Sequence, residues 1–394
     1  MAARLLAHEV SDLCLGKPPL KSLSTSATVR HALAALNSTH ETHISLWTCN
    51  HQNHHSFFDR PIISPCRCVG KISMVDIICY LCRQDSLTSP SAALDSPVSV
   101  LLSPDSAAVV RHVEPATSLV EAIDLIINGA QNLVVPISSR TTMNSKRKQN
   151  LQNGISIAPT THSGGEEFCW LTQDDVIRFL LSSIALFSPT AAYSVEALGI
   201  IDSEILSANY HSPASAALEA ITASLADQTS VAVIDDDGIL IGEISPFTLA
   251  HCDESVAMAI TTLSAGDLMA YIDCGGPPED IIRLVETRLK ERGLTRLLDE
   301  FSPYSSSDDE SSQSPVTVKS GRLSRSSSYS ARITRMAEAI VCYPGSSLVA
   351  VMIQAIAHRV SYVWVIEEDC SVVGIVRFSG MLEVFREHLE RMMS

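Results

Sequence analysis

The pattern of apolar and polar positions repeats four times along the chain. In each copy, a short phrase opens with Pro or Thr, continues with a small hydroxyl residue or Ala, and leads into apolar residues spaced three and four apart. Ser or Thr before such spacing is typical of a helix N-cap, because its oxygen accepts hydrogen bonds from free N–H groups of the first turn. The pattern therefore predicts four helices that begin alike, in Thr25–Ala32, Pro115–Ala122, Pro213–Ala220 and Pro344–Val351.

Two apolar runs follow each helix and predict a pair of adjacent strands. In the third copy an Asp-Asp-Asp-Gly sequence joins the runs, which is a strong hairpin signal. The first two copies match the later ones in length once polar insertions at 50–65 and 140–164 are left out, and both insertions fall between the two strands. The clearest strand pairs are Val231–Ile234 with Ile239–Ile244 in the third copy and Tyr362–Ile366 with Val372–Val376 in the fourth.

A short apolar phrase precedes each helix, and we interpret it as a lead-in strand. A unit of strand, helix, strand, strand and helix, about 60 residues long, buries too little surface to be stable alone. We therefore expect copy one to pair with copy two, in 1–190, and copy three with copy four, in 191–394. The lead-in phrases are Val10–Cys14, Val98–Leu102, Val195–Gly199 and Ala265–Met269, and the predicted repeats span 1–85, 95–190, 191–255 and 260–394.

Composition excludes several classes of partner. The 394 residues are 46% hydrophobic, as in globular proteins, and carry 28 basic against 44 acidic residues, a net charge of −16. The electrostatic field of this net charge repels nucleic acid and anionic lipid, but it does not exclude a local basic pocket that binds a small anion. The eleven cysteines are thinly spread, which suits a reducing compartment. With neither a membrane-spanning stretch nor a targeting segment recognised, we expect a cytoplasmic protein and leave a nuclear location open.

The most specific motif closes the last strand of each copy: Gly, two apolar residues, Ser or Thr, two residues, then Asp. It reads Gly70-Lys-Ile-Ser73-Met-Val-Asp76, Cys169-Trp-Leu-Thr172-Gln-Asp-Asp175, Gly242-Glu-Ile-Ser245-Pro-Phe-Thr248 and Gly374-Ile-Val-Arg377-Phe-Ser-Gly380. Together with the capped helices, this motif resembles that of CBS repeats, named after cystathionine β-synthase. The chain is similar to plant proteins built from CBS repeats alone and, more distantly, to the γ regulatory subunits of AMP-activated (sucrose-non-fermenting-type) protein kinases.

This resemblance covers nearly the whole chain outside the insertions. It implies an α+β fold in which four tandem CBS repeats form two pairs, or Bateman modules, packed into a disc. In the family, the cleft of a pair can bind an adenosine nucleotide, with the motif Asp on the ribose and the Ser or Thr beside the phosphates. The resemblance thus implies nucleotide contacts at Ser73, Asp76, Thr172, Asp175 and Ser245.

The implied function is regulatory and non-catalytic. We expect a sensor of AMP, ADP or ATP that modulates a protein kinase or a metabolic enzyme, and a homodimer stays open. The alternative is an adaptor with empty clefts that works through protein–protein contacts. The degraded motifs favour the adaptor, since Thr248 replaces the acid in copy three and copy four keeps neither polar group; the intact Asp76 and Asp175 favour the sensor.

Cysteine and histidine clusters have structural alternatives. The spacing of the Cys and His residues in and beside the first insertion matches no standard zinc site. We therefore interpret this segment as a solvated loop and predict that it binds no metal. Cys79 and Cys82 form a C-x-x-C pair within an apolar helix face, which predicts buried thiols. No catalytic motif was found, and we expect no enzymatic activity. The residues weighed as zinc ligands are Cys49, His51, His54, His55, Cys66 and Cys68.

The fourth copy contains two insertions of its own. Residues 278–301 place apolar side chains at helical spacing, which predicts a helix that packs on the CBS pair or, alternatively, binds a partner. Residues 302–330 contain 13 serines and few large apolar groups, a composition typical of disorder. Basic residues beside Ser324 and Ser327 make these the candidate phosphorylation sites, with an incidentally charged linker as the alternative.

Overall fold

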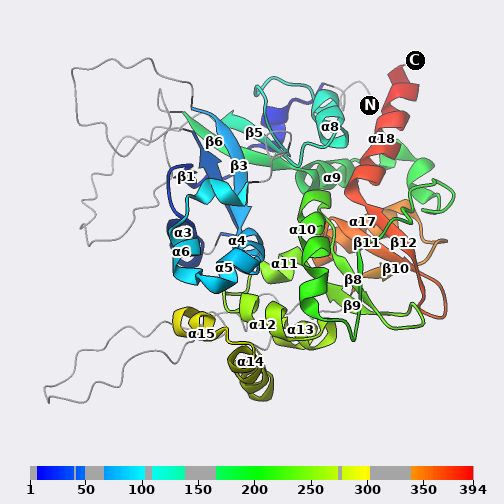
Figure 1. The fold of residues 1–394 in the computed structure, drawn as a ribbon. Helices are drawn as coiled ribbons and strands as arrows, with labels where there is room; N and C mark the ends of the chain where they lie inside the picture. The colour runs from blue at the N-terminus through cyan, green and yellow to red at the C-terminus, as the bar shows by residue number, and fades with distance from the viewer. Residues whose placement is uncertain are drawn as a thin grey trace, which may run out of the picture.

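The fold is known from a computed structural model, which describes seven stretches of the chain (Figure 1). The insertions at 50–65, 140–164 and 302–330 lie outside the described residues, as do the candidate sites Ser324 and Ser327. In the described part, four three-stranded sheets share one topology: a short strand runs parallel to a central strand, and the third strand is antiparallel to it. The described stretches are 7–39, 41–48, 66–102, 109–137, 166–273, 277–301 and 339–393.

The first two sheets and their helices occupy the N-terminal half. The first repeat contains α2 (Val10–Leu13), β1 (Ser22–Ser24), α3 (Val29–Thr39), β2 (His43–Trp47), β3 (Cys68–Ser73), α4 (Met74–Leu81), α5 (Gln84–Thr88) and α6 (Pro90–Asp95). The second contains η2 (Val98–Leu101), β4 (Val110–His112), α8 (Leu119–Ile127), β5 (Asn132–Ile137), β6 (Glu167–Thr172), α9 (Gln173–Ser182), η3 (Ile184–Phe187) and η4 (Thr190–Ala192).

The C-terminal half repeats this order of elements. The third repeat contains β7 (Ser207–Asn209), η5 (Ala214–Ala217), α10 (Leu218–Asp227), β8 (Val231–Ile234), β9 (Leu240–Ile244), α11 (Pro246–Leu249) and α12 (Val256–Thr262). The fourth contains α13 (Ala265–Ile272), α14 (Glu279–Glu291), α15 (Thr295–Phe301), β10 (Val341–Cys342), α17 (Leu348–His358), β11 (Tyr362–Ile366), β12 (Val372–Arg377) and α18 (Phe378–Met393).

The four repeated helices are confirmed, but the predicted lead-in strands are wrong. The helices are α3, α8, η5 with α10, and α17, whereas the lead-in phrases form α2, η2, a turn and α13. Polar side chains in or beside two of these phrases cap a helical turn: Asp12 accepts a hydrogen bond from Glu9 N, and Ser264 accepts one from Asp267 N. The true lead strands β1, β4, β7 and β10 follow later and have only two or three residues.

The two sheets of each pair contact each other. In the first pair a small apolar cluster draws from both sheets, and the rings of Trp47 and Phe168 lie 5.0 Å apart within it. In the second pair the backbone N–H of Leu240 donates to Cys370 O at 3.1 Å, so β9 and the turn before β12 meet directly. These contacts join repeat one to repeat two and repeat three to repeat four, as expected from the sequence.

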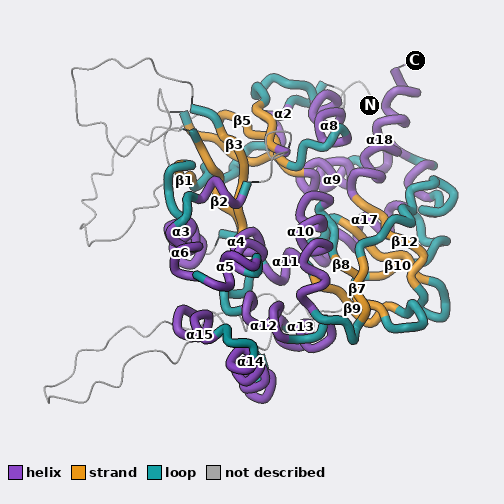
Figure 2. The backbone as a smooth tube through the Cα atoms, in the orientation of Figure 1, coloured by secondary structure: helices purple, strands orange, loops and turns teal. Residues whose placement is uncertain are grey.

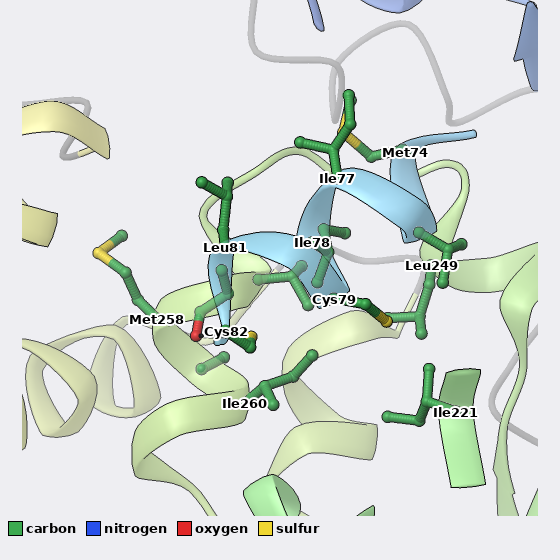
Figure 3. Packing of buried hydrophobic residues seen from close by; sticks show 14 of the residues in the cluster. Met74, Ile77, Ile78, Cys79, Leu81, Cys82, Ile221, Leu249, Met258 and Ile260 are labelled. Carbon is green, nitrogen blue, oxygen red and sulfur yellow. Dashed lines mark hydrogen bonds between the residues drawn. The ribbon is translucent and has the colours of Figure 1, made fainter. Parts of the chain in front are cut away.

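Helices join the two pairs into one body, with α4, α9, α10 and α11 gathered between the sheets of the two halves (Figure 2). Helix α4 packs against α10, α11 and α12 of the third repeat, while α8 and α9 pack against α17 and α18 of the fourth. Ile78 of α4 belongs to the same buried apolar cluster as Ile221, Leu249 and Ile260 (Figure 3). Repeat one therefore lies against repeat three, and repeat two lies against repeat four.

The predicted buried thiols lie in the same core. Cys79 and Cys82 are each 8% exposed, and the Cys82 thiol donates to Ala257 O at 3.7 Å (Figure 3). Burial raises the pKa of Cys79 to about 12 and raises the pKa of Cys82 as well. The prediction of structural thiols is confirmed. Within the described residues no three His, Cys, Asp or Glu side chains gather as metal ligands would, and no helix is long and apolar enough to cross a bilayer.

The 278–301 segment forms two helices, because Gly293 has a left-handed φ of +70° and the first helix ends before it. Helix α14 packs on α12, and α15 packs on α6 of the first repeat. Val285, Leu289 and Leu297 are buried by these contacts. The predicted packing of this segment on the CBS repeats is confirmed. Because α15 belongs to the fourth repeat and contacts the first, it adds a further contact between the two CBS pairs.

Candidate functional site

The predicted contact residues of the first two repeats lie where helices α4 and α9 begin. Ser73 donates from its backbone N–H and its hydroxyl to Oδ2 of Asp76, both at 2.7 Å. Thr172 donates in the same way to Oδ2 of Asp175, both at 2.8 Å. These capping boxes fix each carboxylate at a helix N-terminus, where the helix dipole favours negative charge.

A cleft of about 280 Å³ opens beside Thr172 and Asp175. Strand β6 forms one wall, and the segment that leads into β1 forms another. This segment is held along β6 by a 2.8 Å hydrogen bond from Leu20 N to Phe168 O. The cleft therefore lies between repeat one and repeat two, and its lining includes Lys17, Lys21, Glu41, His43, Trp170 and the two motif residues.

Two lysines on the cleft wall are engaged in different ion pairs. Lys17 Nζ forms an ion pair with Asp175 and donates to Trp170 O at 2.7 Å. Lys21 Nζ lies 3.0 Å from Oε1 of Glu41. The lysine side chains are 21% and 27% exposed. The cleft thus places two carboxylates, two cations and the residue Trp170 around one small volume.

The Asp76 side of this pair is more enclosed. Burial raises the pKa of Asp76, although its hydrogen bonds with Ser73 act in the opposite direction. Burial lowers the pKa of Lys71 to about 8, and the nearby Asp76 charge opposes this shift. Burial also lowers the pKa of His43 to about 3, helped by the positive charges of Lys71 and His251. His43 is therefore neutral at pH 7, and the charges of Lys71 and Asp76 influence each other's pKa.

In the third repeat the motif residue is enclosed by protein groups. Ser245 is 2% exposed; its hydroxyl accepts a hydrogen bond from Phe247 N at 3.2 Å and lies 3.4 Å from the Tyr362 hydroxyl. The adjacent Glu243 is also 2% exposed and accepts hydrogen bonds from Tyr362 and from the Trp364 indole. Nucleotide contact by Ser245 stays a prediction.

In the fourth repeat the chain itself covers the motif. Arg377 forms an ion pair with Asp202, which precedes β7. Asp202 and Ile375 exchange two backbone hydrogen bonds of 2.9 Å, so this segment lies along β12. A Cβ atom at Gly374 would lie 2.5 Å from Asp202 O, which explains why glycine stands there. Residues 200–202 therefore lie in front of β12 as residues 17–20 lie in front of β6.

The structure brings Thr172 and Asp175 together in one cleft and places Ser245 in the other pair. Sequence reasoning missed Lys17, Lys21 and the residues paired with them, because none lies within the repeated motif. The available signal was local: two lysines flank Pro18-Pro19 in an acidic chain, directly before the first repeated helix.

Comparison with known proteins shows the family. The CBS domain-containing protein CBSX5 of Arabidopsis thaliana is 51% identical over 401 residues, covering 99% of each chain. The chain belongs to the CBS domain-containing protein family. A second member from the same plant, CBSX6, is 29% identical over 414 residues, covering 97% of this chain and 94% of the relative. No protein-family model matches the chain. The resemblance drawn from the motif is confirmed, and neither relative is named for a catalytic activity.

A solved structure supports the same conclusion about the fold. Protein MJ1225 of Methanocaldococcus jannaschii, described as a candidate archaeal homologue of γ-AMPK, matches with a TM-score of 0.53 at 13% identity. The match covers 96% of this chain and 100% of that one. The α+β fold of four CBS repeats in two pairs is thereby confirmed.

Proposed function

We propose that this chain is a non-catalytic regulatory protein that binds an adenosine nucleotide in the cleft of its first CBS pair. Binding there alters the activity of a partner protein, which we take to be a protein kinase or a metabolic enzyme. The observation that supports this proposal is the cleft beside Asp175, which combines a helix N-terminus, the carboxylates of Asp175 and Glu41 and two lysines in about 280 Å³.

The cleft offers a matching group for each part of a nucleotide. The Asp175 carboxylate can accept hydrogen bonds from ribose hydroxyls. The N-terminus of α9 and the two lysine ammonium groups favour a phosphate. Trp170 and Pro18 provide apolar wall for a base. Ligand pockets begin at roughly 300 Å³, so this cleft suits a small ligand or widens when one binds.

The segment 17–20, which forms one wall of the cleft, can transmit the effect of ligand binding to a partner. Residues 17–20 link the cleft to β1, and they contact β6 of the other repeat through Leu20. A ligand changes a partner's activity only through its different affinity for two states, typically worth about 1–3 kcal/mol. A movement of this segment between bound and free states is sufficient for an effect of that size.

Calorimetric titration of the full chain with AMP, ADP, ATP and S-adenosylmethionine tests the proposal. We expect at least one adenosine nucleotide to bind, and Asp175→Ala to weaken its binding about 10- to 100-fold, because charge-assisted hydrogen bonds contribute about 1.5–3 kcal/mol. Thr248→Ala, in the third repeat, is the matched control and should leave the affinity unchanged. Full affinity in a folded Asp175→Ala variant would show that the site is elsewhere.

A second candidate function is an adaptor that binds partners without a ligand. The observation that favours it is the second CBS pair, where Glu243 is bonded by neighbouring side chains and Asp202 covers Arg377. The same titration separates the two functions. If none of the four compounds binds at millimolar concentration, the sensor proposal is wrong and the adaptor remains.

A further inference from the structure

Lys17 forms an ion pair with Asp175, whose carboxylate is the group that the proposed ligand would bind. Its ammonium pairs with Asp175, and both side chains are about one-fifth exposed, at 21% and 23%. The ammonium also donates to Trp170 O at 2.7 Å, which holds it against the β6 wall of the cleft. In the ligand-free protein the main carboxylate of the cleft is therefore already neutralised by a group from the opposite wall.

The hydrogen bonds at Asp175 are all directed to one oxygen. Among the described residues, the donors Thr172 N, Thr172 Oγ1 and Lys17 Nζ reach Oδ2. A carboxylate has about four acceptor positions, two on each oxygen, so Oδ1 can accept further hydroxyls. A vicinal diol that binds both oxygens must compete with Lys17 at Oδ2. The two Thr172 bonds belong to the helix cap, and Lys17 is the donor that can leave.

The second pair contains a related ion pair at a different position of the motif. There the segment before β7 places Asp202 against Arg377, which stands where Thr172 stands in the second repeat, whereas Gly380 takes the place of Asp175. There, however, two backbone hydrogen bonds between Asp202 and Ile375 fix the segment on β12. Lys17 reaches Asp175 through a flexible side chain, so its ammonium can move without the backbone.

We propose that Lys17 determines the preference of this cleft for a phosphorylated ligand over its nucleoside. The ribose diol displaces the ammonium from Asp175, and the freed ammonium binds the phosphate of the same ligand. A nucleoside breaks the Lys17–Asp175 pair without replacing it, whereas a nucleotide supplies a new anion. This inference rests on the proposed nucleotide site and assigns its specificity to a residue outside the CBS motif.

Calorimetry with adenosine and AMP on matched variants of the full chain tests the exchange. Lys17→Met keeps the length of the side chain but removes the charge, so adenosine should bind about three- to tenfold more tightly, since no ion pair must be broken. The preference for AMP over adenosine should fall about tenfold or more, because the phosphate loses its cation. Lys17→Arg should retain the preference of the wild-type protein.

Lys290→Met is the matched control, because Lys290 is exposed on α14 and does not line the cleft. It should leave adenosine affinity unchanged. If Lys17→Met weakens adenosine and AMP by the same factor while remaining folded in thermal unfolding, Lys17 only supports the cleft wall and the inference is wrong, although the nucleotide site stands. If the wild-type chain binds neither compound, the proposed function fails and the inference fails with it.

Discussion

The Tyr362 hydroxyl donates to the buried carboxylate of Glu243, with distances of 2.9 and 3.0 Å to its two oxygens. Tyr362 lies on β11 of the fourth repeat and Glu243 on β9 of the third, so this bond crosses the sheet interface of the second pair. The Trp364 indole N–H is a second donor, at 2.8 Å from Oε2. An acidic side chain buried in this way is tolerated only because neighbouring hydrogen-bond donors compensate for its lost hydration.

Removing the Tyr362 hydroxyl should therefore destabilise the second pair. We expect Tyr362→Phe to lower the free energy of unfolding by about 1–3 kcal/mol, because a buried carboxylate loses a donor that water does not replace. Urea unfolding measures the change. Tyr343→Phe is the matched control, since Tyr343 is 52% exposed, and it should change stability by less than about 0.5 kcal/mol. Equal effects of both substitutions would contradict the role of the crossing bond.

Lys71 takes the place of Glu243 in the first repeat, so a half-buried basic residue stands where the third repeat has a buried acidic one. Both follow the glycine of the motif, but burial lowers the pKa of Lys71 to about 8, from an ordinary value of 10.5. Between these values the unfolded chain binds more protons than the folded chain, so stability contributed by this group rises with pH from about 8 to 10.5. Below pH 8 the folded protein carries the full penalty of a partly buried ammonium.

We predict that Lys71→Met stabilises the protein at pH 7 by about 1–3 kcal/mol, because it removes this penalty. The advantage should shrink as the pH rises through 8 toward 10.5. Urea unfolding of both proteins across this range gives the difference, which cancels the titration of other groups. Lys290→Met, at an exposed position on α14, should show no such trend. A difference that does not vary with pH would show that Lys71 keeps its ordinary pKa.

Local patterns explain which parts of the fold the sequence could predict. The repeated helices were found because a cap and an apolar period, as at Ser118 and Leu119, lie within a few residues of each other. The lead strands were missed because β1 and β10 have three and two residues and become strands only by pairing in parallel with a distant partner. Alternation of polarity cannot be detected over such short lengths.

The candidate site divides in the same way. Thr172 and Asp175 interact within one helical turn, so the motif predicts their hydrogen bond directly. Lys17 meets Asp175 across 158 positions of sequence, and Asp202 meets Arg377 across 175. Contacts at such separations depend on how the sheets pair, which a single sequence does not specify. The burial of Glu243 was not predicted for a related reason, since an acidic residue in an apolar strand ordinarily indicates the exposed face.

The last prediction concerns the two helices of the fourth-repeat insertion, for which the sequence left packing and partner binding as alternatives. Leu289 of α14 is fully buried, whereas the adjacent Lys290 is exposed. Truncating a buried leucine leaves a cavity, so Leu289→Ala should lower the free energy of unfolding by about 2–5 kcal/mol. Lys290→Ala should change it by less than about 0.5 kcal/mol, because alanine is a good helix former and no core contact is lost. Urea unfolding at pH 7 measures both. Equal and small effects would show that α14 contributes little to the core, and the partner-binding alternative would then become the better account of this segment.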